Sequence, residues 1–286
     1  ENAADGKHFV TARGWDDLSE MIKLYEENGL AVDEQLICQY LQDARISKDF
    51  AIYYDLFNKY RSDYQVEKIL DGTVSESIVL RAERASMDER LSLLGLIFDS
   101  VTAQLRTVCE RENILDLVTG QLKTLKEKLK DVSGAAALLS EMIKAEREKL
   151  ERGKQSSSIS PQTQRETRFM LEYLEEFRAA VMQSGTAQKD EFSVVRESFA
   201  QKVAELKGLA ADGGRALENV FSFCEKAFAD GDEILIFVTE LTANYYSARF
   251  IGRYGCDRYY MHNKQLQFDQ RQQEIIKRMD EIQWTV

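Results

Sequence analysis

The sequence contains little proline and no long apolar run. Its 286 residues include a single proline, Pro161. Proline breaks helices because it lacks a backbone donor and clashes with the preceding turn, so its absence elsewhere leaves long helices possible. Apolar runs such as residues 234–238 are far shorter than the roughly 18 residues that a membrane-spanning helix needs. We therefore expect an all-α chain that does not interact with a membrane.

Histidine is also scarce, and the common enzyme motifs are absent. The two histidines, His8 and His262, are too few for a zinc site or for a Ser–His–Asp arrangement, which both need several partners. There is no GxxxxGK[ST] phosphate loop, no GxGxxG after a strand and no GxSxG elbow. We expect this chain to contain no catalytic residue, no metal and no cofactor of its own, and each histidine to have a structural or surface role.

Basic residues are fewer than acidic residues, 38 against 49. The formal net charge is -11 and the isoelectric point is about 5.0, so the overall field repels phosphate backbones and argues against nucleic-acid binding. The four cysteines form no CxxC pair and read as buried free thiols, which suits a reducing, cytoplasmic compartment. No signal peptide is evident. Because the sequence begins at Glu1 without methionine, we expect a piece of a longer protein.

Short apolar stripes at helical spacing predict a compact helical domain in residues 1–72. A first helix is expected over residues 11–28, with Gly29 as its left-handed stop. Asp33 is expected to cap a second helix and Ser47 a third, and a short fourth helix closes the domain. Such a unit is within the size range of an independently folding small domain.

The remaining residues, 73–286, predict longer helices arranged as antiparallel hairpins or a bundle. Ser86 and Glu89 fit a capping box at the start of one of them. A heptad-like apolar stripe follows over residues 101–132, typical of either an oligomer seam or an intramolecular hairpin. A reversal at Ser133–Gly134 favours the hairpin, with a returning helix that ends near residue 152.

Residues 153–160 have the composition of a linker and are expected to form a mobile hairpin tip. Ser160 and Pro161 then predict the start of another helix. The run at 234–238 keeps helical spacing as far as Ala248, so we expect helix rather than strand there. Further helix breaks are expected at four places: Ser184–Gly185, Asp212–Gly213–Gly214, Asp230–Gly231 and Gly255.

Two other patterns suggest chemistry but favour structure. Neighbouring carboxylates, at Asp16–Asp17, Glu26–Glu27 and Glu175–Glu176, point about 100° apart on a helix and do not face one site. They are typical of solvated faces rather than of an acid/base pair. The aromatic-rich helices near the C-terminus are expected to pack as a core rather than to stack nucleic-acid bases.

The sharpest signal lies at the start of the first helix. Thr11 is placed to cap it, which puts Arg13 in the first turn, where the helix dipole disfavours a cation unless an anion is nearby. A bound phosphate would reverse that balance, because backbone N–H groups and the guanidinium would converge on it. Arg13 is therefore the candidate binding residue of the sequence.

This arrangement resembles the second sensor of AAA+ ATPases of the MoxR type, in which a hydroxyl residue, a spacer and an arginine open a helix of the C-terminal lid. Thr11, Ala12 and Arg13 occupy these places, and the segment QYLQDARISKDFAIYYDLFNKY is similar to the region after this arginine in MoxR-like ATPases of Gram-positive bacteria. The resemblance covers residues 1–72, about a quarter of the chain. Ala12 departs from the family, where proline is frequent, and so does Gly14.

The resemblance implies a C-terminal ATPase region: a lid-like domain followed by a helical accessory arm. An upstream ATPase core would hold ATP and magnesium, and Arg13 would contact the γ-phosphate. The arm would contact a protein partner or substrate, as MoxR-like ATPases do with proteins that often carry a von Willebrand factor A-type domain. Two alternatives remain, namely a free-standing helical scaffold or adaptor, and an enzyme or ligand-binding bundle with an unrecognised site.

Overall fold

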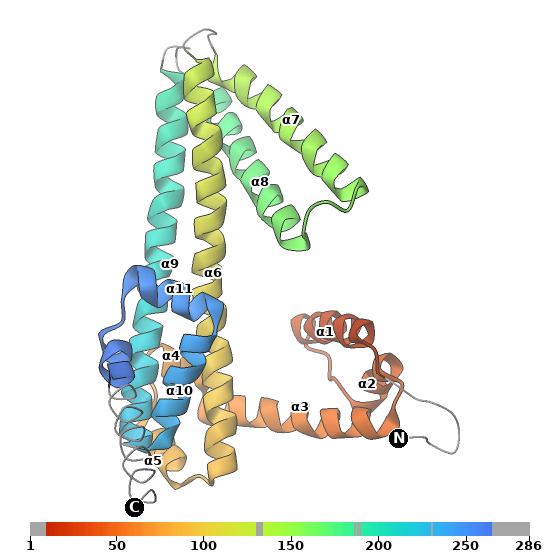
Figure 1. The fold of residues 1–286 in the computed structure, drawn as a ribbon, viewed down its shortest axis with the longest axis vertical. Helices are drawn as coiled ribbons and strands as arrows, with labels where there is room; N and C mark the ends of the chain where they lie inside the picture. Colours follow the sequence, from red (N-terminus) through yellow and green to blue (C-terminus); the bar gives the residue numbers. More distant parts are fainter. Residues whose placement is uncertain (1–9, 130–133, 186, 188–189, 230, 265–286) are drawn as a thin grey trace, which may run out of the picture. The chain divides into compact units, whose positions relative to one another are not determined.

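The structure is a computed structural model that describes residues 10–129, 134–185, 187, 190–229 and 231–264. The predicted all-α fold is confirmed, because these ranges form helices and turns without a strand (Figure 1). The helices are α1 (Ala12–Glu27), α2 (Glu34–Leu41), α3 (Ala44–Tyr64), α4 (Val66–Leu70), α5 (Glu76–Arg84), α6 (Met87–Lys128), α7 (Ala135–Gln155), α8 (Pro161–Ser184), α9 (Glu191–Phe228), α10 (Asp232–Ala243) and α11 (Tyr245–Tyr254).

Two compact units make up the chain, and they do not coincide with the predicted division after residue 72. Unit 1 comprises residues 1–66 and 76–96, and unit 2 comprises residues 67–75 and 97–286. The first turns of α6 therefore belong to unit 1, and the rest of the helix belongs to unit 2. A single cut in the sequence cannot describe units that exchange segments in this way.

Specific contacts explain the exchange. In unit 1, the Tyr64 hydroxyl donates to Glu89 Oε1 at 2.6 Å, and the Arg81 guanidinium lies 5.0 Å from the Tyr64 ring centroid. In unit 2, the side-chain amide of Asn219 donates to the Leu70 carbonyl at 2.8 Å. Residues 76–96 thus pack around the end of α3, whereas α4 ends against α9.

A small core holds unit 1 together. Leu18, Ile37 and Leu41 are buried, and Ile22 and Phe50 pack against them half-buried. These side chains come from α1, α2 and the first half of α3. On α1 and α2 these core residues lie four positions apart, which agrees with the apolar spacing in the sequence.

The helix ends of unit 1 follow local sequence signals with one exception. Gly29 has φ +66° just after α1, and Asp33 Oδ1 accepts from the Leu36 N–H at 2.9 Å, both as predicted. The prediction that Ser47 caps α3 is wrong. Asp43 caps the helix by accepting from two backbone N–H groups at 3.0 Å, and Ser47 lies one turn inside, fully buried. Aspartate and serine are both good caps. Asp43 is the cap because the turn after α2 consists of only two residues, so α3 begins at Ala44, before Ser47.

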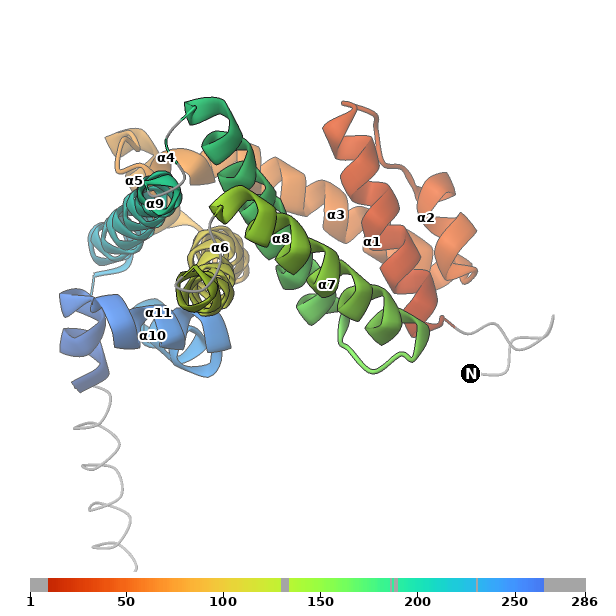
Figure 2. The same cartoon turned by 90° about the horizontal axis from the view of Figure 1, so that it is seen from above.

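Unit 2 is built on two long helices, α6 and α9, which lie side by side (Figure 1, Figure 2). The helices α7 and α8 form an antiparallel hairpin at one end of this pair. Near the other end, α10 packs on α9 and α11, and the Phe237 ring meets Phe221 and Phe98 edge-on at 5.4 and 6.5 Å. The aromatic C-terminal helices are therefore a packed core, as predicted.

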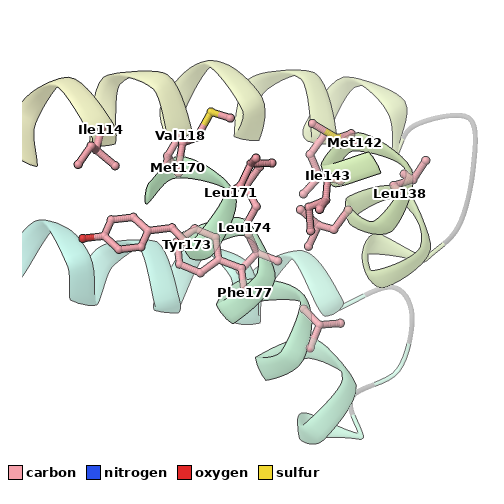
Figure 3. Packing of buried hydrophobic residues seen from close by; sticks show 14 of the residues in the cluster. Ile114, Val118, Leu138, Met142, Ile143, Met170, Leu171, Tyr173, Leu174 and Phe177 are labelled. Atoms are coloured by element: carbon pink, nitrogen blue, oxygen red, sulfur yellow. The ribbon is translucent and has the colours of Figure 1, made fainter. Parts of the chain in front are cut away.

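The heptad-like stripe of α6 is buried inside unit 2. Leu115, Val118 and Leu125 pack with α7, α8 and the start of α9 in one apolar cluster (Figure 3). This matches the intramolecular alternative for the stripe. The predicted partner was wrong, however, since α7 pairs along its length with α8 rather than with α6. Ser133, at the predicted reversal, lies outside the described residues, whereas Gly134 directly precedes α7.

Two predicted breaks differ from the structure. Residues 212–214 lie within the continuous helix α9, where a Cβ on Gly213 would stand only 3.2 Å from Leu105 Cδ2, so this glycine serves close packing rather than a turn. The helix predicted to run on to Ala248 is interrupted at Asn244, whose Oδ1 accepts from the Tyr246 N–H at 3.0 Å and starts α11. The breaks at Gly185 and Gly255, and the helix at 234–238, are confirmed.

The segment predicted as a mobile linker, residues 153–160, contains the turn between α7 and α8. Ser160 Oγ accepts from the Thr163 N–H at 3.1 Å and Pro161 occupies the first helical position, both as predicted. Ile159 packs against the apolar cluster and would lie 2.8 Å from a Cβ on Gly153. Glycine at this position lets the turn fold closely onto the last turn of α7.

One described helix, α6, is long and apolar enough to cross a membrane when only its length and composition are considered. The same helix supplies the buried side chains of Val101, Leu105 and Val118 to the interior of unit 2. The core helix of a protein can have the same length and apolar composition. The expectation that the chain does not interact with a membrane stays a prediction.

Candidate functional site

The start of α1 has the local geometry expected from the sequence. Thr11 adopts an extended backbone (φ −99°, ψ 153°), and its Oγ1 accepts from the Gly14 N–H at 3.0 Å. The Trp15 N–H donates to the Thr11 carbonyl at 3.2 Å and closes the first helical turn. The N–H groups of Ala12 and Arg13 have no partner within the helix, because no preceding turn exists to accept from them. The helix therefore begins with outward-facing donors beside Arg13.

Gly14 and Trp15 fix this first turn to the rest of unit 1. A Cβ on Gly14 would stand 2.7 Å from the Tyr40 carbonyl oxygen, so only glycine lets α1 approach the end of α2 this closely. Trp15 meets Phe50 of α3 edge-on, with ring centroids 5.0 Å apart. The glycine that departs from the family pattern is thus explained by packing within unit 1.

The Arg13 side chain is exposed and makes only a loose ion pair. Its side chain is 89% exposed, and Nε lies 3.7 Å from Asp17 Oδ2, which is too long for a hydrogen bond and is an exposed i,i+4 ion pair. Such pairs contribute little in water, so a phosphate could displace Asp17 at small cost. The contacts of Thr11, Gly14 and Trp15 fix the helix start to unit 1, while the Arg13 guanidinium remains accessible.

A row of aromatic side chains runs from this helix start along α3. Ring centroids of Trp15, Phe50, Tyr53 and Phe57 follow one another at 5.0, 6.2 and 6.2 Å. Tyr53 is 60% exposed, and its neighbour Leu56 is also exposed. We call these four rings the aromatic row. Only their helical spacing was visible in the sequence, and it does not tell which of them face solvent.

A second polar cluster, in unit 2, was missed by sequence reasoning. Glu112 interrupts the apolar stripe of α6 but is buried, with 2% of its surface exposed. It accepts from Arg249 at 3.1 Å, from Arg253 at 2.9 Å and from the Tyr254 hydroxyl at 2.5 Å. Burial and the hydrogen bond to Glu112 raise the pKa of Tyr254 to about 12. A lone acidic residue in an apolar stripe is the signal that could have indicated a buried partner.

The Glu112 cluster attaches α11 to α6 and has a structural character. The buried carboxylate is paired with both guanidinium groups, and Glu112 is not among the residues that line the three hollows described for unit 2. The two guanidinium groups replace part of the water that this buried carboxylate loses. We therefore assign it to the architecture of unit 2 rather than to chemistry.

His262 also has a structural environment. Its Nε2 lies 3.0 Å from Glu225 Oε1, and its ring stacks on Phe221 with centroids 5.7 Å apart. Arg258 pairs with the same carboxylate at 2.5 Å. Across the described part of the chain, no group of histidine, cysteine, aspartate and glutamate side chains is arranged to hold a metal. His8 lies outside the described residues.

The neighbouring carboxylates are engaged in separate contacts rather than in shared sites. Glu26 accepts from the Tyr54 hydroxyl at 2.7 Å in unit 1. In unit 2, Glu175 pairs with Arg147 and Glu176 with Lys202, on different helices. These contacts place Glu175 and Glu176 against different partners, and the expectation that the neighbouring carboxylates form no acid/base pair stays a prediction.

Free thiols account for all four cysteines, and three of them, Cys109, Cys224 and Cys256, are buried as predicted. Cys38 is half-buried. Burial raises the pKa of the Cys109 and Cys224 thiols, and raises that of Cys256 to about 12. Because the thiolate is the reactive form, these three buried thiols are poor nucleophiles at neutral pH.

Comparisons with family models, with curated proteins and with solved structures found no match to this chain. The assignment of a function therefore depends on the residues themselves and on the geometry around Arg13.

Proposed function

We propose that this chain is the C-terminal region of a MoxR-like AAA+ ATPase, with a lid-like domain and a helical arm that couples nucleotide state to a protein partner. The observation that carries the proposal is the start of α1, where Thr11 caps the helix and Arg13 stands exposed in its first turn. A bound anion is favoured at such a helix start, because the helix dipole and the free backbone N–H groups attract it and the anion offsets the charge of Arg13.

The mechanism we propose has Arg13 contact the γ-phosphate of ATP held, with magnesium, by an upstream ATPase core. Loss of that phosphate removes the anion that offsets the guanidinium at the helix start. Gly14 and Trp15 pack this turn against α2 and α3. A displacement of Arg13 on loss of the phosphate would therefore also move the helices of unit 1 that pack against it. The chain itself is then non-catalytic, cytoplasmic and dependent on the core for ATP and magnesium.

Replacing Arg13 with alanine in the full-length protein tests this proposal. We expect ATP hydrolysis to fall about 10- to 100-fold, because a charge-assisted hydrogen bond contributes about 1.5–3 kcal/mol. Arg84→Ala is the matched control, since Arg84 is an exposed arginine of the same unit. Equal turnover in wild type and Arg13→Ala, at saturating ATP and with normal folding, would remove Arg13 from the mechanism. A coding sequence without a phosphate loop upstream of Glu1 would contradict the whole proposal.

The aromatic row supports a second candidate, a free-standing helical scaffold or adaptor. Tyr53 and Leu56 expose apolar surface on α3, and surface of this kind is typical of protein contacts. A start codon directly before Glu1, together with a defined partner whose binding is lost in Tyr53→Ser, would favour this candidate. The Arg13→Ala variant should then bind that partner normally.

A further inference from the structure

A hollow in unit 2, between α6 and the start of α8, contains arginines that have no carboxylate partner. The hollow has a volume of about 170 Å³. Its apolar wall is formed by Ile114 and Phe169, and its polar wall includes Arg106, Arg111 and Arg165. A cavity of about 150 Å³ is enough to hold benzene, so this one fits a group about the size of one ring.

The Arg111 side chain is held by a tyrosine hydroxyl and two aromatic rings, and not by a carboxylate. Its guanidinium donates to the Tyr173 hydroxyl and lies 5.5 Å from the Phe169 ring centroid and 5.9 Å from the Tyr173 ring centroid. Figure 3 shows Tyr173 and Ile114 at the same end of the apolar cluster, with the Tyr173 hydroxyl directed away from the apolar side chains. The partners of this half-buried guanidinium are thus a hydroxyl and two rings, and none of them is an acidic group that would offset its charge.

Arg165 is the second unpaired cation at this hollow. It lies on the exposed first turns of α8, and no ion pair or hydrogen bond of its side chain occurs among the described residues. Arg106 differs, because it pairs with Glu110 at 2.7 Å. The other acid at the hollow, Glu166, accepts from the side-chain amides of Asn113 and Gln162 at 2.9 and 3.0 Å.

The neighbouring hollow shows the contrast. It shares Arg111 and Phe169 with the first, but its own cation, Lys202, pairs with Glu176 at 2.8 Å and lies 3.9 Å from Glu205. Its three glutamates outnumber its two basic residues. At the first hollow, three arginines face two glutamates, which leaves one net positive charge. In a chain of net charge -11, this local excess is available to a small anion.

We propose that the hollow bounded by Arg111, Arg165 and Phe169 binds a small organic anion: a carboxylate or phosphate carried on an apolar group of about one ring. The anion pairs with the two unpaired guanidinium groups, and the ring lies against Phe169 and Ile114. The site is separate from Arg13 and does not depend on the proposed ATPase role. It gives the helical arm a ligand of its own.

Benzoate and its neutral isostere benzamide test the site in the intact chain. We expect chemical-shift titration to show benzoate binding with changes centred on Ile114 and Phe169, about tenfold or more tighter than benzamide because one charge-assisted pair is lost. Phenyl phosphate distinguishes the two anion classes. Whichever of benzoate and phenyl phosphate binds with the higher affinity identifies whether the arginines prefer a carboxylate or a phosphate. Equal binding of benzoate and benzamide, or no localised change with any probe, would overturn the proposal.

Substitutions at matched positions locate the binding. Arg165→Gln should weaken the preferred anion about tenfold, whereas Arg168→Gln, which removes the same charge three residues along α8, should leave it within about twofold. Arg111→Lys keeps the charge but loses the planar fork, and should weaken the anion more than it weakens benzamide. Since Arg165 and Arg168 are both exposed, neither glutamine variant should alter thermal unfolding. Equal losses in Arg165→Gln and Arg168→Gln would show a diffuse charge effect and contradict a built site.

Discussion

The two units of this chain contrast in how they bury apolar surface. In unit 1, α1, α2 and the first half of α3 pack around a small core and leave Tyr53 and Trp15 of the aromatic row partly exposed. Unit 2 aligns long helices whose apolar faces are buried along most of their length, including Phe177 and Leu174 with no exposed surface. Both are all-α, so secondary structure alone does not separate them.

This contrast suggests a division of roles. The aromatic row exposes apolar surface that is available for other proteins or domains, while the large apolar cluster of unit 2 provides a stable frame. The proposed functional arginine, Arg13, lies on the first kind of unit, and the proposed anion site lies on the second. Four predictions test or sharpen the comparison.

The largest expected effect is at the core of unit 2. Phe177→Ala should lower the free energy of unfolding by about 3–5 kcal/mol, because it removes a fully buried ring and leaves a cavity. Tyr53→Ala in unit 1 should change it by less than about 0.5 kcal/mol, since that ring is largely exposed. Urea unfolding followed by circular dichroism measures both. Comparable losses would mean that the exposed ring of Tyr53 contributes as much to stability as the buried ring of Phe177.

The buried carboxylate of α6 should give the next effect. Glu112→Gln leaves Arg249 and Arg253 without their carboxylate and should cost about 3 kcal/mol, because a buried ion pair is broken on one side. Glu110→Gln, two residues earlier, breaks a more exposed pair with Arg106 and should cost less than about 1 kcal/mol. Thermal unfolding of both variants checks the difference. If Glu110→Gln cost as much, burial would not be the cause.

Two glycines of unit 1 should respond in opposite directions. Gly14→Ala should destabilise by about 1–3 kcal/mol, because its Cβ would stand 2.7 Å from the Tyr40 carbonyl oxygen. Gly95→Ala should stabilise by about 0.5–1 kcal/mol, because this helical position has no atom nearby and alanine is the better helix former. Melting temperatures of the two variants suffice. A stabilising Gly14→Ala would disprove the close approach of α1 to α2.

The smallest expected effect is a loss of stability in alkali that both units share. Burial and a hydrogen bond to a glutamate raise the pKa of Tyr64 in unit 1 and of Tyr254 in unit 2 from the ordinary value of 10.0 to about 12. The folded state therefore holds these protons more tightly than the unfolded state. Their contribution is complete below pH 10 and is lost as the pH rises toward 12.

Phenylalanine at each tyrosine separates the two contributions. Tyr64→Phe and Tyr254→Phe should each make the loss of stability between pH 10 and 12 less steep than in wild type. In each variant, one tyrosine hydroxyl that would release a proton on unfolding is absent. Unfolding by urea at several pH values measures the slope. An unchanged slope in both variants would show that neither hydroxyl is protonated differently in the folded state.

Local signals in the sequence were sufficient for the helix ends that depend on residues three or four apart. Thr11, Asp33 and Ser160 cap their helices as predicted, and Gly29, Gly185 and Gly255 end theirs. The candidate site follows the same rule, since a capping threonine two residues before Arg13 already places the guanidinium in the first turn. The exposure of Arg13 and the anchoring of Gly14 could not be predicted, because both depend on α2 and α3.

The all-α class, the caps and the placement of Arg13 in a first turn were thus already determined by neighbouring residues. Tertiary packing decided the rest. It kept Gly213 and Gly214 inside α9, because α6 approaches closely there, and it chose Asp43 over Ser47 as a cap. It also buried Glu112 beside two arginines more than a hundred residues away. Each outcome depends on a contact between distant segments, which no local spacing records.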